Sequence, residues 1–357
     1  MSSPTLSPAP TGAVPMPGIL RTPGARTPSV ASAAAAHKAA ARRRIWVMAA
    51  LGLCAALACL LYLFANVNPK FFDYAMSLRI PRLAGIVTAA VAVAGASLVF
   101  QTVIRNHIVT PCLLGMNSLY VLIHTVVAFV FGATSAFAAD PVAQFAVDLV
   151  LMGLMGLLIY GVLFEKTGGN VLYILLIGTV LTTFFSSIQA SLVRMMDPNE
   201  YDALLTSLTA SFTNVSAPLI PAALAILAGL VVVLRRDLAV LNILALGRDA
   251  ATNLGVDYER TTRRLLVGVA LSIAVATALV GPISFLGLIT ANLSRRLFVT
   301  YRHGTLVAGS VLIGIVVLAG GQFAVEHLAA FSVPVSVFIT ITGGVYFLYL
   351  ILRSKGL

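Results

Sequence analysis

Long apolar runs separated by short polar stretches fill most of the chain after residue 44. A membrane-spanning helix needs about 20 apolar residues, and on that rule the chain divides into ten candidate spans. These lie near residues 45–66, 83–104, 111–132, 142–164, 171–194, 217–234, 265–283, 285–298, 305–328 and 334–352. The eighth is short for a full crossing, and Gly281-Pro282-Ile283 before it can break a helix, so the seventh and eighth could be one bent unit. The pattern predicts an all-α integral membrane protein with ten transmembrane helices.

The first 43 residues follow a different pattern. They are rich in Pro, Ser, Thr, Ala and Gly, with scattered basic residues and the run Arg42-Arg43-Arg44. Nothing in them can form a core, so the sequence predicts a disordered cytoplasmic tail over 1–43 and a ten-helix domain over 44–357. A basic run before an apolar stretch also suggests a signal peptide, but this stretch is longer than the usual one. A retained first helix is therefore predicted.

The composition agrees with a membrane protein. Hydrophobic residues make up 59% of the chain and charged residues only 10%, with a mean hydropathy of +1.00, whereas a typical soluble chain is roughly a quarter charged. This excludes an ordinary cytosolic enzyme, a disordered scaffold and a secreted disulfide module. The three cysteines show no metal-ligand spacing, so neither a metal nor a cofactor is expected.

The net charge of +11 would suggest nucleic acid in a soluble chain, but here it reports topology. Ten spans put both termini on one side. If that side is the cytoplasm, 19 of the 23 basic residues face it, and the charges are +14 inside, −2 outside and −1 within the membrane. We therefore expect cytoplasmic termini and no nucleic-acid partner. The basic residues on the opposite side are Lys70, Arg79, Arg82 and Arg194.

The longest polar insertion after the tail runs from 235 to 264, on the predicted cytoplasmic side. Its pattern predicts a short helix from about Arg248 to Asn253, flanked by Gly247 and Gly255. The segment is either a solvated connector or a docking helix for a cytoplasmic partner. The candidate coupling residues are Leu246, Gly247, Arg248, Asp249, Ala250, Asn253, Leu254 and Gly255.

Two other features have both a structural and a functional interpretation. Arg79 and Arg82, just before the second span, either anchor a helix at the headgroups or dock an acidic extracytoplasmic partner, because Arg suits pairing with carboxylates. The fifth span has a stripe of small and hydroxyl residues that indicates either helix packing or a pathway lining. Its candidate pathway residues are Thr179, Thr182, Thr183, Ser186 and Gln189.

Ionisable residues inside the membrane are functional candidates by default. The fourth span carries Asp148 and the third His124, neither with an evident partner in the sequence. Asp148 could also simply reach the headgroups near the outer end of its span. No catalytic constellation is visible, and the nearest approach to a phosphate-binding loop, 161–167, has Glu165 where GxxxxGK[ST] requires its second glycine. Any ATP used must be hydrolysed by another chain.

Several motifs together resemble the FecCD-type permeases of iron–siderophore and cobalamin ABC importers, over most of residues 78–353. They are Leu78-Arg79-Ile80-Pro81-Arg82, Gln101 with Arg105-Asn106 and Pro111-Cys112-Leu113-Leu114-Gly115, Leu246-Gly247-Arg248 with Leu254-Gly255-Val256, Gly281-Pro282-Ile283-Ser284-Phe285-Leu286-Gly287-Leu288, and Pro334 with the span leading to Tyr349. Their order and separations make the resemblance specific.

The resemblance implies a type II ABC importer permease fold in the cell membrane, transporting iron–siderophore chelates. It also implies as partners a second permease, two cytoplasmic ATP-binding subunits and an extracytoplasmic binding protein. Arg79 and Arg82 would meet acids of the binding protein, the Gly247–Gly255 loop would enter a cleft of the ATPase, and the fifth span would line the pathway between the permeases. Residues 111–120 look most like one member of a two-permease system, which implies a heterodimer rather than a homodimer.

Three positions depart from the family pattern. Asn106-His107 stands where the family commonly has Asn-Pro, and Ala291-Asn292 stands where it has Pro-His. Glu326 and His327 occupy the neighbourhood of a basic residue often found late in the ninth span.

Two rival classes are an ion-coupled secondary transporter, which needs inverted repeats and midplane charges, and an intramembrane enzyme, which needs a polar cluster.

Overall fold

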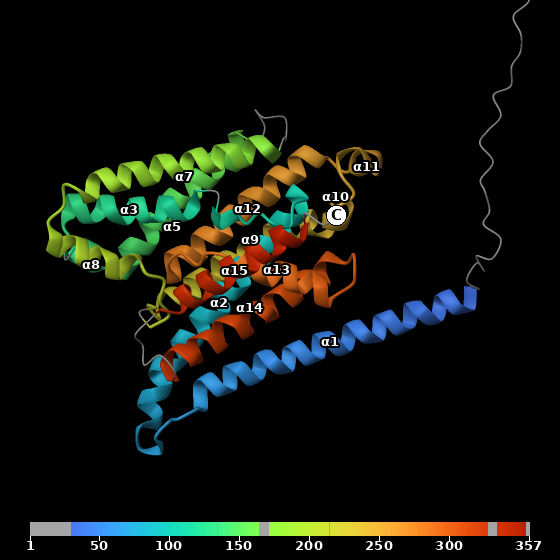
Figure 1. Cartoon of the computed structure of the whole chain (residues 1–357), viewed down its shortest axis with the longest axis horizontal. Coiled ribbons are helices and arrows are strands. Elements are labelled where there is room, and N and C mark those ends of the chain that lie inside the picture. Colours follow the sequence, from blue (N-terminus) through green and yellow to red (C-terminus); the bar gives the residue numbers. More distant parts are fainter. Residues whose placement is uncertain are drawn as a thin grey trace, which may run out of the picture. The chain divides into compact units, whose positions relative to one another are not determined.

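The computed structural model describes residues 30–113, 115–133, 135–163, 171–213, 215–327 and 334–354. Every element of this described part is helical (Figure 1). The chain divides into two units, Met1–Ile45 and Trp46–Leu357. The elements are α1 (Val30–Phe64), η1 (Pro69–Phe71), α2 (Phe72–Ile104), η2 (Pro111–Leu113), α3 (Met116–Phe131), α4 (Ala136–Ala139), α5 (Pro141–Gly156), the π-helix η3 (Leu157–Leu163), α7 (Val171–Val193), α8 (Pro198–Leu208), α9 (Leu219–Ala239), α10 (Leu241–Leu244), α11 (Arg248–Asn253), α12 (Tyr258–Val280), α13 (Leu286–Leu297), α14 (His303–His327) and α15 (Val335–Ser354).

Each of the ten predicted spans coincides with a helix, but not every helix has the length of a span. Seven helices in the described part are long and apolar enough to cross a membrane, and Met116–Phe131 and Val335–Tyr349 are shorter apolar helices. α13 has only 12 residues. The third predicted span is shortened because residues 111–113 form a separate 3-10 turn and Gly115, with φ +89°, redirects the backbone before α3.

Two boundaries differ from the sequence pattern. α1 begins at Val30 rather than near residue 45, so the later part of the tail predicted to be disordered is helical, while residues 1–29 lie outside the described part. The alanines between Val30 and Arg42 explain this, since Ala has the highest helix propensity. The seventh and eighth predicted spans are separate helices rather than one bent unit. α12 ends at Val280, and Gly281 has φ +93°, which an L side chain rarely adopts.

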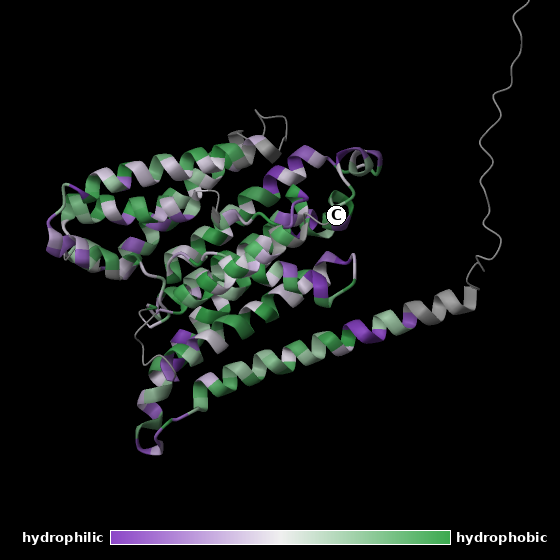
Figure 2. Cartoon of the chain, viewed as in Figure 1, coloured by the Kyte–Doolittle hydropathy of each residue, from purple (hydrophilic) through white to green (hydrophobic). Residues whose placement is uncertain are grey.

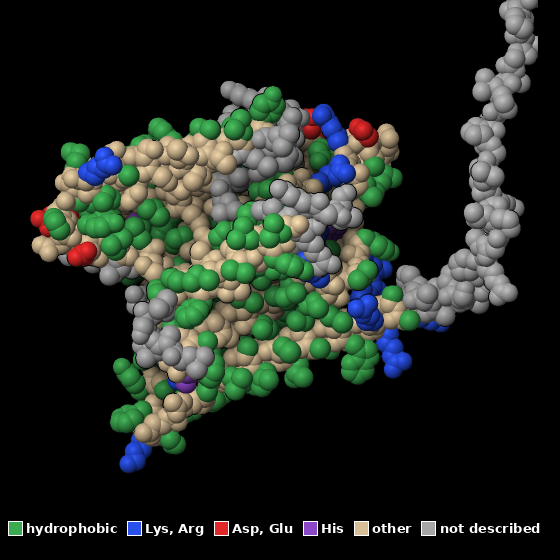
Figure 3. Space-filling model, viewed as in Figure 1, with side chains coloured by type: hydrophobic (Ala, Val, Ile, Leu, Met, Phe, Trp, Pro, Cys, Tyr) green, Lys and Arg blue, Asp and Glu red, His purple; other side chains and the backbone are tan. Residues whose placement is uncertain are grey.

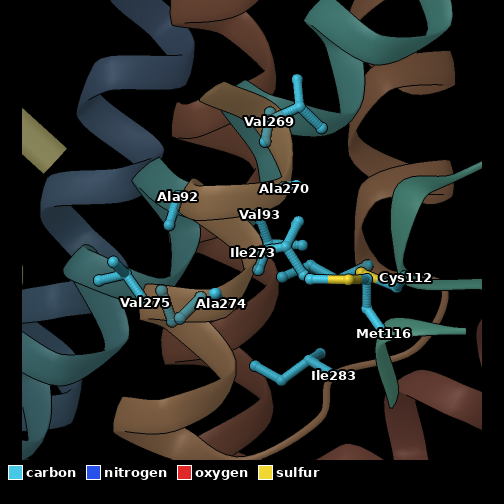
Figure 4. Packing of buried hydrophobic residues seen from close by; sticks show 14 of the residues in the cluster. Ala92, Val93, Cys112, Met116, Val269, Ala270, Ile273, Ala274, Val275 and Ile283 are labelled. Carbon is cyan, nitrogen blue, oxygen red and sulfur yellow. The ribbon is translucent and has the colours of Figure 1, made fainter. Parts of the chain in front are cut away.

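The core of the second unit lies around α2 and α12, which pack against each other and against α14, α5 and α9. Figure 4 shows small side chains such as Ala92, Ala270 and Ala274 beside Val93 and Ile273, with no polar atom among the labelled residues. Small residues let the helices approach closely, as at Gly156, where an added Cβ would overlap the side chain of Ala270.

Much of the surface of the second unit is apolar. Large hydrophobic side chains stay exposed along the helices, among them Val233 at 76%, Leu53 at 72% and Leu176 at 59%. Figure 3 shows hydrophobic side chains spread over the visible face, with charged ones mainly near the helix ends. Figure 2 shows the same arrangement on the ribbon, hydrophobic along the helices and hydrophilic at their ends. Such a surface is expected of a protein that lies within lipid.

Candidate functional site

The predicted loop helix is present with the predicted bounds. α11 spans Arg248–Asn253, and Gly247 and Gly255 flank it with φ of +105° and +81°. Both torsions lie in the region that favours glycine. At Gly247 space is restricted as well, because an added Cβ would lie 2.8 Å from the Nη1 atom of Arg105, at the end of α2. Figure 1 shows α11 beside the first turns of α12, with α10 next to α11.

α11 exposes both apolar and charged groups. Leu246 and Leu254, on either side of the helix, are 62% and 61% exposed, and Asp249 and Asn253 are also exposed. Ala250 is half-buried, and the buried neighbour Ala251 attaches the helix to the bundle. Exposed leucines beside charged residues form the kind of surface that a protein partner covers.

One ion pair ties α11 to the start of α12. The guanidinium of Arg248 pairs with the Glu259 carboxylate, and the two side chains are 60% and 57% exposed. An ion pair this exposed adds little to stability because water and salt screen it. The pair therefore orients Arg248 without preventing a partner from approaching it.

Two departures from the family pattern contact each other next to this loop. The Nδ2 atom of Asn292, on α13, donates to the carbonyl oxygen of His107 at 2.9 Å and to that of Leu288 at 3.0 Å. Partial burial and the positive charge of Arg295 lower the pKa of His107. The contact joins the α2–η2 connection to α13 through the Asn292 side chain and a backbone carbonyl, so the residue type at 292 decides it and the side chain of His107 does not take part.

The predicted docking arginine Arg79 has partners within the chain. Its Nη1 atom donates to the carbonyl oxygens of Tyr62, Leu63 and Ala65 at 3.1, 2.9 and 2.9 Å. These belong to the last turn of α1 and the residue after it, where carbonyls lack helical partners. A cation at the C-terminal end of a helix also interacts favourably with the helix dipole. Arg79 therefore caps α1.

The second predicted docking residue, Arg82, belongs to a polar cluster that includes Glu326, near the end of α14. The Nη1 atom of Arg82 lies 4.0 Å from Glu326 Oε1, and the two side chains are 21% and 6% exposed. The same oxygen accepts hydrogen bonds from the Tyr62 hydroxyl at 3.1 Å and the Gln322 amide at 3.0 Å. Where the family often has a base, this chain has an acid that joins α1, α2 and α14.

The hydroxyl stripe of the fifth span divides between two environments on α7. Gly178 is buried against the η2–α3 connection, and Thr182 beside it and Gln189 are half-buried, while Thr179, Thr183 and Ser186 are exposed. The threonine hydroxyls donate to carbonyls of their own helix, for example Thr182 to Gly178 at 2.8 Å and Thr183 to Thr179 at 3.0 Å. Only 11% of the most apolar stretch of α7 is buried. This helix has an uncovered face within the second unit.

The two intramembrane ionisable residues are partners, which the sequence did not indicate. His124 Nε2 lies 3.0 Å from Asp148 Oδ2, and the side chains are 7% and 2% exposed. The Tyr120 ring packs on the imidazole with centroids 4.2 Å apart. Asp148 therefore does not reach the surface but ties α5 to α3. The spacing of 24 residues gives no periodic signal, since the contact depends on how two helices pack.

The described residues show no cluster of side chains typical of a catalytic or metal site. They contain no group of three or more His, Cys, Asp or Glu side chains that could hold a metal ion. The segment 161–167 was predicted not to be a phosphate loop. Its residues from 164 onward lie outside the described residues.

The apolar surface, the helical fold and the exposed loop helix define a multi-pass membrane protein of the transporter permease class. The model of the FecCD transport family matches residues 45–353, and the chain belongs to this family. It is similar to the petrobactin import system permease protein YclO of Bacillus subtilis, with 40% identity over 84% of this chain and 95% of the relative.

Another relative and a solved structure agree. The petrobactin import system permease protein FatC of Bacillus anthracis is 31% identical over 91% of this chain and 94% of the relative. The fold is similar to an inward-facing metal-chelate type ABC transporter, with a TM-score of 0.74, 20% identity, and coverage of 87% of this chain and 99% of that one. The sequence-based assignment of family and fold class is confirmed, while ten spanning helices are not established.

Proposed function

We propose that this chain is a permease subunit of an ABC importer that carries iron–siderophore chelates across the cytoplasmic membrane. The observation that carries the proposal is the 40% identity to a petrobactin permease over nearly the whole of that protein. Because FatC is also a petrobactin permease, petrobactin is the first substrate to test. ATP is hydrolysed by a partner, as expected for a chain whose nearest phosphate-loop match lacks the required glycine.

The proposed topology has ten membrane segments and both termini in the cytoplasm. The distribution of basic residues supports it, because the ten-span layout places 19 of the 23 Lys and Arg residues on the same side as α11, and such an excess marks the cytoplasmic side. In this orientation α11 faces the ATPase, and the first turns of α2 face the outside.

Coupling to ATP hydrolysis is assigned to the stretch from Leu246 to Gly255. The exposed Leu246 and Leu254 would enter an apolar cleft of the ATPase, with Arg248 and Asp249 at its margin. The buried Ala251 and the constrained backbone at Gly247 make α11 a firm extension of the bundle. Movement of the ATPase pair would thus pass to α12 and α2 as a rigid-body displacement.

The outer face is proposed to receive a siderophore-binding protein near Arg79 and Arg82. Arg79 is already bound to α1 carbonyls and Arg82 is paired with Glu326. An acidic group of the binding protein would therefore compete with Glu326 for Arg82. Docking would be weaker than with unpaired arginines, and would depend on Glu326.

The translocation pathway is proposed to form where α7 meets a second permease. Its exposed Thr179, Thr183 and Ser186 lie on a helix that the second unit leaves largely uncovered, which supports an interface there. Thr182 and Gln189 would lie at its edge. A heterodimer is the favoured pairing, because residues 111–120 look like one member of a two-permease system.

The proposal is tested by uptake of ⁵⁵Fe-petrobactin in cells lacking this gene, complemented by the wild-type chain. We expect restored uptake that is lost when the phosphate-loop lysine of the partner ATPase is replaced. A matched ferric hydroxamate serves as the substrate control. Uptake that survives loss of the ATPase but collapses with a protonophore would favour the secondary-transporter alternative and overturn the ABC assignment.

A further inference from the structure

A cavity of about 880 Å³ opens where α9, α12 and η3 meet, at the two ends of the 235–264 insertion but outside the Leu246–Gly255 stretch assigned to coupling. Its volume lies in the range of ligand sites, roughly 300–1,000 Å³. Its lining residues belong to α9, α12 and η3, not to α11 or α7. We propose that it binds an anionic phospholipid of the surrounding membrane.

The mouth of the cavity is strongly basic. Arg235 and Arg236 lie near the end of α9, and Arg263 and Arg264 lie near the start of α12. α10 and α11 connect these two helices, which pack against each other, so both arginine pairs lie at the same end. With Asp237, the charged lining residues have a net charge of +3.

The lone acid at the mouth is itself engaged. Asp237 Oδ1 lies 3.9 Å from Arg264 Nη1, and its side chain is only 11% exposed. Arg235 and Arg236 are exposed. Guanidinium groups suit phosphate because they present several donors in a planar arrangement.

Beyond the mouth, the walls are apolar. Leu230 of α9, Val267 and Leu271 of α12 and Leu157 of η3 line the part toward the helix middles. Gly268 allows α9 to approach closely, because an added Cβ there would overlap the Leu234 side chain. The site thus pairs a basic mouth with a hydrocarbon-lined interior.

This order of chemistry matches a phospholipid and its orientation in a bilayer. The arginines lie where helices leave the apolar region, which is where phosphates of the lipid headgroups lie, and the apolar walls run parallel to acyl chains. In the proposed topology the mouth faces the cytoplasmic leaflet, whose anionic lipids attract basic groups near the surface. A soluble anion would use the mouth but not the walls.

The test uses the full-length chain, purified in detergent and stripped of lipid, with dioleoyl phosphatidylglycerol and dioleoyl phosphatidylcholine as probes. Native mass spectrometry measures the bound lipid. We expect phosphatidylglycerol to bind at least tenfold more tightly than phosphatidylcholine. Equal binding of the two lipids would overturn the proposal.

Two variants locate the site. Arg235→Gln with Arg236→Gln should weaken phosphatidylglycerol binding on the order of tenfold or more, and Val267→Phe should reduce it by filling the interior. The matched control is Arg260→Gln with Arg302→Gln, which removes the same charge from exposed positions outside the cavity. If the control variant loses phosphatidylglycerol binding to the same extent, the effect comes from surface charge in general, and the proposed binding site is wrong.

Two further measurements distinguish a bound lipid from a soluble anion and from a protein partner. Inorganic phosphate at millimolar concentration should leave lipid binding unchanged, and complete displacement by phosphate would show a simple anion site instead. The second measurement is chemical labelling of the arginines in the intact importer. If the wild-type chain binds no lipid and a protein partner protects these arginines from labelling, the cavity belongs to that partner and the proposal is wrong. Circular dichroism in detergent checks that each variant is folded. If a variant does not fold, the preference of the wild-type chain for phosphatidylglycerol over phosphatidylcholine decides the proposal.

Discussion

Two clusters of charged side chains at opposite ends of the bundle differ in how deeply they are buried. At the α11 end, the Arg248–Glu259 pair is 60% and 57% exposed. At the other end, Arg82 and Glu326 are 21% and 6% exposed, and Arg79 is bound to three carbonyls. His124 and Asp148, within the bundle, are buried further still. A charge that water can solvate is available to a partner, whereas a buried one mainly holds helices together.

The largest effect on stability is expected from breaking the His124–Asp148 pair. His124→Leu or Asp148→Leu alone leaves the other polar group buried without its partner, so each should lower the free energy of unfolding by about 3 kcal/mol. The double variant should recover a substantial part of that loss, because no polar group is left unpaired. Thermal unfolding in detergent measures all three. Strictly additive losses would show that the two residues do not interact.

A smaller effect is expected at the end of α1. Arg79→Met removes hydrogen bonds from a charged donor to the carbonyls of Tyr62, Leu63 and Ala65, and should cost about 2 kcal/mol. Hydrogen exchange over residues 60–66 should speed up with it. Lys70→Met, at an exposed position between α1 and α2, is the control and should change neither quantity. If Lys70→Met destabilises the protein equally, surface charge rather than capping explains the result.

Glu326→Gln should change the proposed recognition of the binding protein. The change frees Arg82 from a carboxylate, so the proposed capture of the binding protein should strengthen about threefold, as expected for roughly 0.6 kcal/mol of partly exposed electrostatics. Arg82→Gln should weaken it. Surface plasmon resonance with the purified binding protein measures both. Identical affinities for the wild-type chain and both variants would remove Arg82 from the docking surface.

The smallest effect on stability is expected at α11, together with the largest effect on transport. Arg248→Gln and Glu259→Gln should each change the free energy of unfolding by less than about 1 kcal/mol, since the pair is exposed. Arg248→Glu or Asp249→Lys should separate ATP hydrolysis from iron uptake while the protein stays in the membrane. The comparison of ATPase rate with uptake in proteoliposomes decides this. Glu259→Gln controls for loss of the Arg248 pair, and normal uptake by Arg248→Glu would contradict the coupling role.

The sequence predicted the backbone well where local chemistry decides it. Apolar runs located a helix at each of the ten predicted spans but did not indicate α8, and glycines at 247 and 255 defined α11 because their torsions favour glycine. It was less successful at α1, where alanines extend the helix to Val30, and at the third span, which a 3-10 turn shortens. Helix propensity and turn geometry there override a simple count of apolar residues.

The sequence by itself thus determined the helices, the loop helix and membership of the FecCD family, because periodicity, turn residues and ordered motifs are local properties. Only the tertiary structure decided which side chains meet. It brought His124 to Asp148, Arg79 to the end of α1 and Asn292 to His107, and it collected four arginines at one cavity mouth. Such contacts depend on how separate helices pack against one another, which no local pattern encodes.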